Sequence, residues 1–145
     1  MLAAALGPLV PDADVLMVDA TGRDHPRRAG LALHLGERLG LPSIGVTHRP
    51  LVARGDEPDD ADGATSPLTL DQEQVARWVR TVAGVRPVVA HAAWRTDAQV
   101  AAEVVLRTRA GARTPEPLRQ ARRVARERRS AAERLHDPGE VLGHP

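Results

Sequence analysis

Residues 14–30 read Asp14-Val-Leu-Met-Val-Asp-Ala-Thr-Gly-Arg-Asp-His-Pro-Arg-Arg-Ala-Gly30, and the rest of the chain is organised around them. The apolar run at residues 15–18 ends in an acid, Asp19, which is followed by a glycine, a histidine and two arginines. This pattern predicts a buried strand that delivers a carboxylate to the edge of a sheet. Because ligands of open α/β sheets bind beyond the carboxyl ends of the strands, Asp19 is a candidate site residue. The basic residues after it indicate an anionic partner.

Length and composition indicate one soluble, cytoplasmic domain. The 145 residues suffice for one core and are too few for two. The absence of cysteine excludes disulfides and thiolate metal sites, and it fits a reducing compartment. No apolar run approaches the length of a membrane span, and the first residues lack the basic flank of a signal peptide. We expect a single domain over residues 1–135 and a flexible tail over residues 136–145.

Charge is unevenly distributed along the chain, although the net charge is only +1. Residues 107–134 contain ten of the twenty arginines and three glutamates, so this segment carries +7 and leaves −6 for the rest. A basic C-terminal helix beside an acidic site is what a protein that binds a phosphate backbone needs.

The first half of the chain predicts a parallel βαβ unit. The strand at residues 15–18 precedes a helix over residues 26–39, with Asp24 as its N-cap, and a second strand at residues 42–48. Two strands joined by one helix are expected to be parallel, with a right-handed crossover. Residues 2–10 resemble the end of another helix.

The second half is less clear from its pattern. Residues 54–67 hold five acids among glycines and prolines and predict a solvated, mobile loop, because the spacing of the acids does not fit a Ca²⁺ loop. Residues 70–91 fit either a helix or an antiparallel hairpin, and the periodicity alone slightly favours the helix. Two further helices are expected, one over residues 98–109 with Asp97 as its N-cap and one that starts at Pro115. The residues expected to face inward are Val100, Ala101, Val104 and Val105 in the first helix, and Leu118, Ala121, Val124 and Ala125 in the second.

Three stretches carry a longer motif: Val18-Asp-Ala-Thr-Gly-Arg-Asp-His-Pro-Arg-Arg-Ala-Gly-Leu-Ala-Leu-His-Leu-Gly36, Leu41-Pro-Ser-Ile-Gly-Val46 and Pro115-Glu-Pro117. Together they resemble the endonuclease V family, nucleases that act on deoxyinosine in DNA or on inosine in RNA. The resemblance implies a ribonuclease H-like α/β fold with a parallel βαβ core, a following hairpin and C-terminal helices, which favours the hairpin at residues 70–91. It also implies that this fold is incomplete, because the family's N-terminal strands have no counterpart here.

The resemblance implies a site as well. Asp19 matches a metal-binding, catalytic Asp of the family, and His25 matches a catalytic His placed near the phosphate. The resemblance implies Mg²⁺ or Mn²⁺ as the cofactor of phosphodiester hydrolysis in DNA repair, and DNA or RNA that contains inosine as the partner. The residues implied to contact nucleic acid are Ala20, Thr21 and Gly22 around the base, together with Arg27, Arg28, His48 and Arg49.

The chain also departs from the family's pattern. Ala20 stands where the family usually has Gly, His48 where it has Lys, and Trp94 where it has His. The family's first metal-binding Asp and its Glu lie upstream of the central strand, whereas the first eleven residues here contain no acid. One carboxylate alone binds Mg²⁺ weakly, and neither Asp24 nor Asp97 is expected to add a ligand.

Three functions therefore stay open. The chain is an endonuclease V-like nuclease whose N-terminal part is absent, or a catalytically dead paralogue that binds nucleic acid or acts as a scaffold. The third function, a small phosphate-handling α/β enzyme that uses Asp19 and His25, is disfavoured by the family motif. An unpaired edge on the strand at residues 15–18 predicts a homo-oligomer, or pairing with the missing N-terminal segment.

Overall fold

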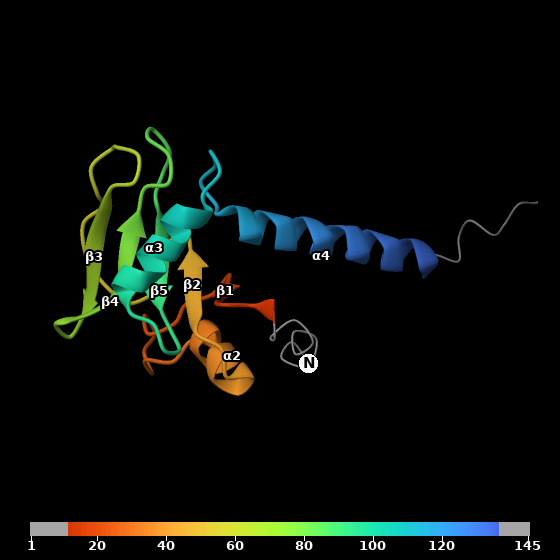
Figure 1. Cartoon of the computed structure of the whole chain (residues 1–145), viewed down its shortest axis with the longest axis horizontal. Coiled ribbons are helices and arrows are strands. Elements are labelled where there is room, and N and C mark those ends of the chain that lie inside the picture. Colours follow the sequence, from red (N-terminus) through yellow and green to blue (C-terminus); the bar gives the residue numbers. More distant parts are fainter. Residues whose placement is uncertain (1–11, 137–145) are drawn as a thin grey trace, which may run out of the picture.

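The protein, as a computed structural model, is described for residues 12–136 and consists of a five-stranded mixed sheet with three helices (Figure 1). The strands lie side by side in the order β1-β2-β5-β4-β3. Their bounds are Leu16–Val18 (β1), Ser43–Thr47 (β2), Thr65–Leu70 (β3), Glu73–Val79 (β4) and Val88–Ala92 (β5). The helices are Leu31–Leu39 (α2), Ala98–Thr108 (α3) and Glu116–Leu135 (α4). The predictions for residues 2–10 and 137–145 lie outside the described residues.

The predicted βαβ unit is confirmed, because β1 and β2 are parallel with Val18 opposite Gly45. Its helix is shorter than predicted and begins at Leu31, after a turn at residues 25–28. The prediction of Asp24 as the N-cap is wrong. The Asp24 side chain is fully buried and accepts the backbone N–H groups of residues 51, 52 and 53 at 2.7, 2.8 and 2.7 Å. A buried carboxylate is costly unless it is hydrogen-bonded, and these three bonds satisfy it. Asp24 thus holds residues 51–53, while the N-cap of α2 is Gly30.

The predicted hairpin within residues 70–91 is confirmed by the antiparallel pairing of β4 with β5. The loop prediction for residues 54–67 is wrong at its end, because β3 starts at Thr65 and pairs with β4. The buried Arg80 holds the segment before β3 and pairs with Glu57 at 3.9 Å and with Asp60 at 3.7 Å. Its guanidinium donates to the carbonyls of Pro58, Asp59 and Val85 at 3.0, 2.8 and 2.7 Å.

Helices α2 and α3 cover opposite faces of the sheet. Ile44 and Val46 of β2 point towards α3, where they pack with Ala101 and Val105. Ser43 lies on the other face of the same strand, and its hydroxyl donates to the Ala32 carbonyl of α2 at 2.7 Å. The alternation of a strand thus assigns each helix to one face.

Helix α3 has the predicted N-cap, since the Asp97 carboxylate accepts the Val100 N–H at 2.8 Å. The prediction that Val100 faces inward is wrong, because it is 40% exposed.

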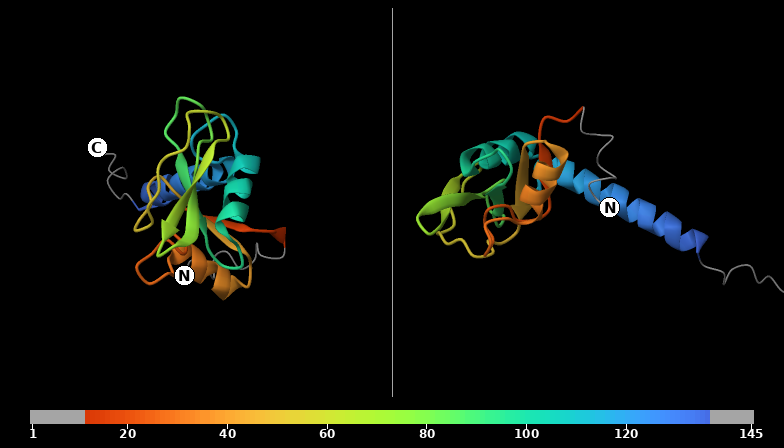
Figure 2. Two further views of the ribbon diagram at one scale, coloured as in Figure 1. Left: turned by 90° about the vertical axis from the view of Figure 1, so that its left-hand side faces the viewer. Right: turned by 90° about the horizontal axis from the view of Figure 1, so that it is seen from below.

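Helix α4 starts as predicted, and Leu118 in its first turns is buried. The rest of its predicted inward face is not covered by the described chain: Val124 is 48% exposed, and the distal part of α4 extends away from the sheet (Figures 1 and 2). No helix of residues 12–136 is long and apolar enough to cross a membrane.

Candidate active site

Asp19 lies directly after β1, where the sequence predicts it, and its carboxylate contacts the other end of the chain. Oδ2 accepts from Arg122 Nη2 at 2.6 Å and from Arg122 Nε at 3.2 Å. Arg122 belongs to α4, four residues after the buried Leu118 and thus on the same side of the helix. Sequence reasoning did not identify this pair. The signal available was that the side of α4 that buries Leu118 also carries Arg122.

The loop after Asp19 is fixed by close backbone contacts that require glycine. A Cβ on Gly22 would lie 2.1 Å from the Ala92 carbonyl oxygen at the end of β5. A Cβ on Gly45 of β2 would lie 2.1 Å from the carbonyl oxygen of Ala20. The Thr21 carbonyl accepts the N–H of Ala32 at 3.1 Å, which joins the loop to α2. The loop is therefore held between two strands and a helix, and it fixes the position of the Asp19 backbone.

His25 and Arg27 form a local turn beyond this loop. His25 Nδ1 accepts the Arg27 N–H at 3.0 Å, so the neutral imidazole carries its proton on Nε2. His25 is half-buried and Arg27 is exposed. Within the described chain His25 and Asp19 share no hydrogen bond or ion pair.

Arg28 has its charge engaged by the β3–β4 hairpin. Its guanidinium contacts Asp71 at 2.9 Å and Glu73 at 2.8 Å, and its backbone has a positive φ of 60°. These contacts link the loop before α2 to the far side of the sheet. Arg28 therefore positions the hairpin, in addition to its predicted contact with nucleic acid.

His48 and Arg49 follow β2 and line a cavity of about 310 Å³ together with Arg86 and Arg113. The pKa of His48 is lowered by partial burial and by the positive charges of Arg113 and Arg122, while Asp19 acts in the opposite direction. His48 therefore lies near Asp19, and the lowered pKa favours its neutral form. The sequence predicts that His48 replaces a fixed positive charge of the family with a titratable group.

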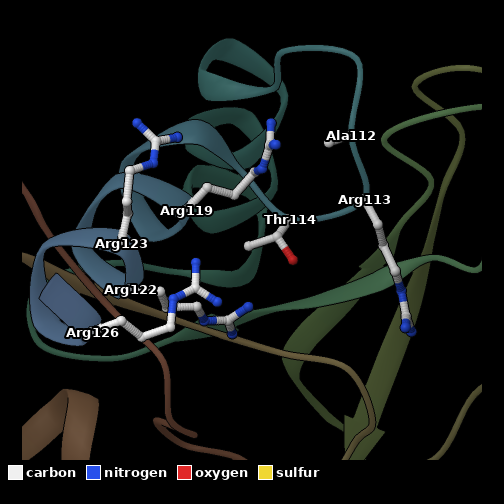
Figure 3. Close-up of a pocket in the computed structure, with 7 residues that line it drawn as sticks. All are labelled: Ala112, Arg113, Thr114, Arg119, Arg122, Arg123 and Arg126. Carbon is white, nitrogen blue, oxygen red and sulfur yellow. The ribbon is translucent and has the colours of Figure 1, made fainter. Parts of the chain in front are cut away.

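A second cavity of about 370 Å³ lies beside the first and shares Arg113 with it. Figure 3 shows the guanidinium groups of α4 on its wall. Its lining residues are Ala112, Arg113, Thr114, Arg119, Arg122, Arg123 and Arg126. So dense a set of cations suits an anion with several negative charges.

A buried network supports the end of β2. The Thr47 hydroxyl donates to the Arg49 carbonyl at 2.7 Å, so the 2.7 Å contact between His91 Nε2 and Thr47 is donated by the ring. His91 Nδ1 then carries the lone pair, has no hydrogen-bond partner and lies 3.8 Å from Asp24. Burial lowers the pKa of His91 to about 4, against the opposing effect of the Asp24 charge.

The described residues do not fit a divalent metal site by themselves. Residues 12–136 contain no group of three or more His, Cys, Asp or Glu side chains that could hold a metal ion. Asp19 is paired with a guanidinium, Asp24 is saturated by backbone N–H groups, and Asp97 caps α3. Mg²⁺ needs several oxygen ligands, and one carboxylate paired with arginine does not supply them.

The mixed sheet, the βαβ core and the acid at the end of the first strand define a ribonuclease H-like α/β domain, and solved endonuclease V structures share this fold. The Endonuclease V from Streptomyces avermitilis superposes with a TM-score of 0.76 and 35% identity, covering 82% of this chain and 52% of that one. The Ciona intestinalis Endonuclease V, solved in complex with a 24mer DNA containing an inosine followed by a ribo-adenosine, superposes with a TM-score of 0.69 and 23% identity, covering 89% of this chain and 60% of that one.

This chain belongs to the endonuclease V family, whose profile matches residues 1–123. The Endonuclease V of Methanopyrus kandleri is 44% identical over 122 residues, which are 84% of this chain and 53% of that protein. The chain therefore spans about half the length of the curated relatives it matches.

Proposed function

We propose that this chain acts as an endonuclease V, hydrolysing phosphodiester bonds in DNA or RNA that contains deoxyinosine or inosine, in nucleic-acid repair in the cytoplasm. The observation that carries the proposal is the fixed loop after β1, which holds Asp19 against Arg122 on the wall of the larger of two adjoining cavities lined by cationic side chains. The inosine-containing DNA bound by the Ciona relative supports the choice of substrate.

Each predicted site residue has a role in this proposal. Asp19 and His25 act at the scissile phosphate, where His25 donates from Nε2 because Nδ1 already accepts the Arg27 N–H. The loop at residues 20–22 faces the base, and it has little freedom to adapt because Gly22 and Gly45 leave no space around it. The remaining residues contact the phosphate backbone: Arg27, Arg28, His48 and Arg49.

Mg²⁺ or Mn²⁺ dependence belongs to the proposal only with carboxylates from outside residues 12–136. When bound, such an ion polarises the phosphate and activates water. Asp19, which pairs with Arg122, would be one oxygen ligand of such an ion from the described part of the chain.

Cleavage of a labelled duplex with a single deoxyinosine, beside the same duplex without it, tests the proposal. We expect cleavage of the inosine duplex with Mg²⁺ and none in EDTA. Asp19→Asn should lower the rate by about a hundredfold or more, because a loss of about 3 kcal/mol of charge stabilisation corresponds to that factor. Asp56→Asn, in the exposed acidic segment, is the matched control and should leave the rate unchanged. Wild-type rates in Asp19→Asn would remove Asp19 from the mechanism.

One observation favours a second function, a catalytically dead paralogue that binds nucleic acid or serves as a scaffold. The Asp19 carboxylate already has a cationic partner, and the described residues around it hold no acidic cluster. This function predicts binding of the oligonucleotide with no cleavage at any concentration of Mg²⁺ or Mn²⁺. Metal-dependent product that disappears in Asp19→Asn would exclude it.

A further inference from the structure

Helix α4 continues beyond the part of the chain that the family profile matches. The family match ends at residue 123, whereas α4 runs on to Leu135. Residues 123–135 are all exposed, and this part of the helix stands away from the sheet in the right-hand view of Figure 2. We call residues 123–135 the α4 arm. Its first residues, Arg123, Ala125 and Arg126, line cavities beside the rest of the domain, and all its side chains are exposed, so they are accessible to a partner.

The arginines of α4 are concentrated on one side of the helix. Arg119, Arg122, Arg123 and Arg126 all line the 370 Å³ cavity (Figure 3). Arg129 follows Arg126 by three residues and lies on the same side, because residues three or four apart are neighbours on a helix. We call Arg123, Arg126 and Arg129 the basic face. Arg128 is rotated by about 200° from Arg126 and lies on the opposite side.

The ion pairs of α4 show which of these charges are free. Arg119 pairs with Glu116 at 3.1 Å, and Arg122 pairs with Asp19 at 2.6 Å. Arg123, Arg126 and Arg129 have no ion pair with any residue of the described chain. The free positive charge of α4 next to the site is therefore that of the basic face.

The spacing and neighbours of the basic face suit a chain of phosphates. Arg123 and Arg129 are six residues apart, or about 9 Å along the helix, which spans about three phosphates of one strand at about 3.4 Å each. The shared Arg113 connects this cavity to the one lined by His48, Arg49 and Arg86, so cations extend from the arm to the end of β2. The opposite side of the arm carries Val124, Arg128, Ala131 and Leu135 and no aromatic side chain, so it lacks the wide apolar face of a helix that lies in a membrane.

We propose that the basic face of the α4 arm binds the phosphate backbone of nucleic acid without selecting the base. The inference deepens the proposed function and rests on it for the choice of partner. Two of its three arginines, Arg126 and Arg129, lie beyond residue 123, where the family profile ends, and the basic face holds the nucleic acid whether or not a deoxyinosine is present.

The test measures binding of the full chain to a fluorescent 24-base-pair duplex without deoxyinosine, by anisotropy in EDTA at several salt concentrations between 50 and 200 mM. Arg123→Gln, Arg126→Gln and Arg129→Gln are combined in one variant. We expect the slope of log affinity against log salt to become less negative by about 3, since each phosphate contact contributes about 0.9. We also expect binding at 50 mM salt to weaken by tenfold or more.

A control variant removes the same charge elsewhere, at Arg38 of α2, Arg107 of α3 and Arg128 on the far side of α4, all of which are exposed. The slope of log affinity against log salt should change in this control by less than half as much as it changes in the first variant. Equal loss in both variants would overturn the proposal, because net charge alone would then account for binding. Stronger binding of the wild type to phosphatidylserine vesicles than to the duplex would overturn it too. Because the probe contains no deoxyinosine or metal, failure of the cleavage assay leaves this result unaffected.

Discussion

Among single residues, the buried pair of His91 and Asp24 predicts how stability depends on pH. Burial lowers the pKa of His91 to about 4 in the folded protein, while the same ring titrates near 6.5 when unfolded. Between these values the unfolded state binds more protons than the folded state, so the free energy of unfolding falls as the pH is lowered from 6.5 towards 4. Above pH 6.5 both states hold a neutral ring, and this contribution no longer changes.

Urea denaturation at pH 7.5, 6.5 and 5.5 measures this effect before most carboxylates titrate. His91→Gln keeps a donor for Thr47 and removes the titrating group, so the variant should lose less stability than the wild type over this range. Identical pH dependence in the two proteins would show that His91 takes up its proton as readily in the fold as in the unfolded chain.

The site residues also show what the sequence could and could not predict. The position of Asp19 followed from an apolar run that stops at an acid, which is a local pattern. The role of Asp24 did not, because its three donors lie 27 to 29 residues away in the chain. The Arg122 partner of Asp19 is 103 residues away, and only the packing of α4 on β1 brings the two together.

Among the elements, the β3–β4 hairpin turns through two non-glycine residues in the left-handed backbone region. Its two turn residues, Asp71 and Gln72, have φ values of 49° and 69°, as in a type I′ turn. Gln72→Gly should raise the free energy of unfolding by about 1 kcal/mol, because glycine adopts this conformation without steric cost. Asp71 stays unchanged in this variant and keeps its ion pair with Arg28.

Thermal denaturation compares Gln72→Gly with Gln74→Gly, which places the same residue inside β4. The second variant should be destabilised, since a strand interior loses a side chain and gains flexibility. A lower stability of Gln72→Gly than of the wild type would mean that the turn is not the source of strain.

Strand β3 itself was missed by sequence reasoning for physical reasons. It is an edge strand, contains Pro67, and has Leu68 as its only fully buried residue. An edge position tolerates proline, and a half-solvated strand leaves little apolar pattern. Helix α4 shows the opposite case. Its periodicity predicted the helix correctly, but periodicity cannot show whether a partner covers the apolar side.

For the whole molecule, the uncovered surface at β1 predicts self-association. Within the described chain β1 pairs only with β2, so its other edge is free. A mostly apolar cavity of about 270 Å³ lies between this strand, α2 and α4. Its apolar lining consists of Leu16, Met17, Val18, Leu35, Leu118, Ala121 and Ala125. An open strand edge beside an apolar surface favours pairing with another chain, and in a pure sample that chain is a second copy.

Sedimentation of the purified chain over a range of concentrations tests this prediction. We expect a species larger than the 15.5 kDa monomer that dissociates on dilution. Ala125→Glu places a charge in the cavity lining at an exposed helical position, so it should yield a monomer without disturbing the core. Ala131→Glu adds the same charge farther along α4, outside that lining, and should leave association intact. A wild-type chain that stays monomeric and unfolds cooperatively at every concentration would contradict the prediction, and would mean that the β1 edge is stable without a partner.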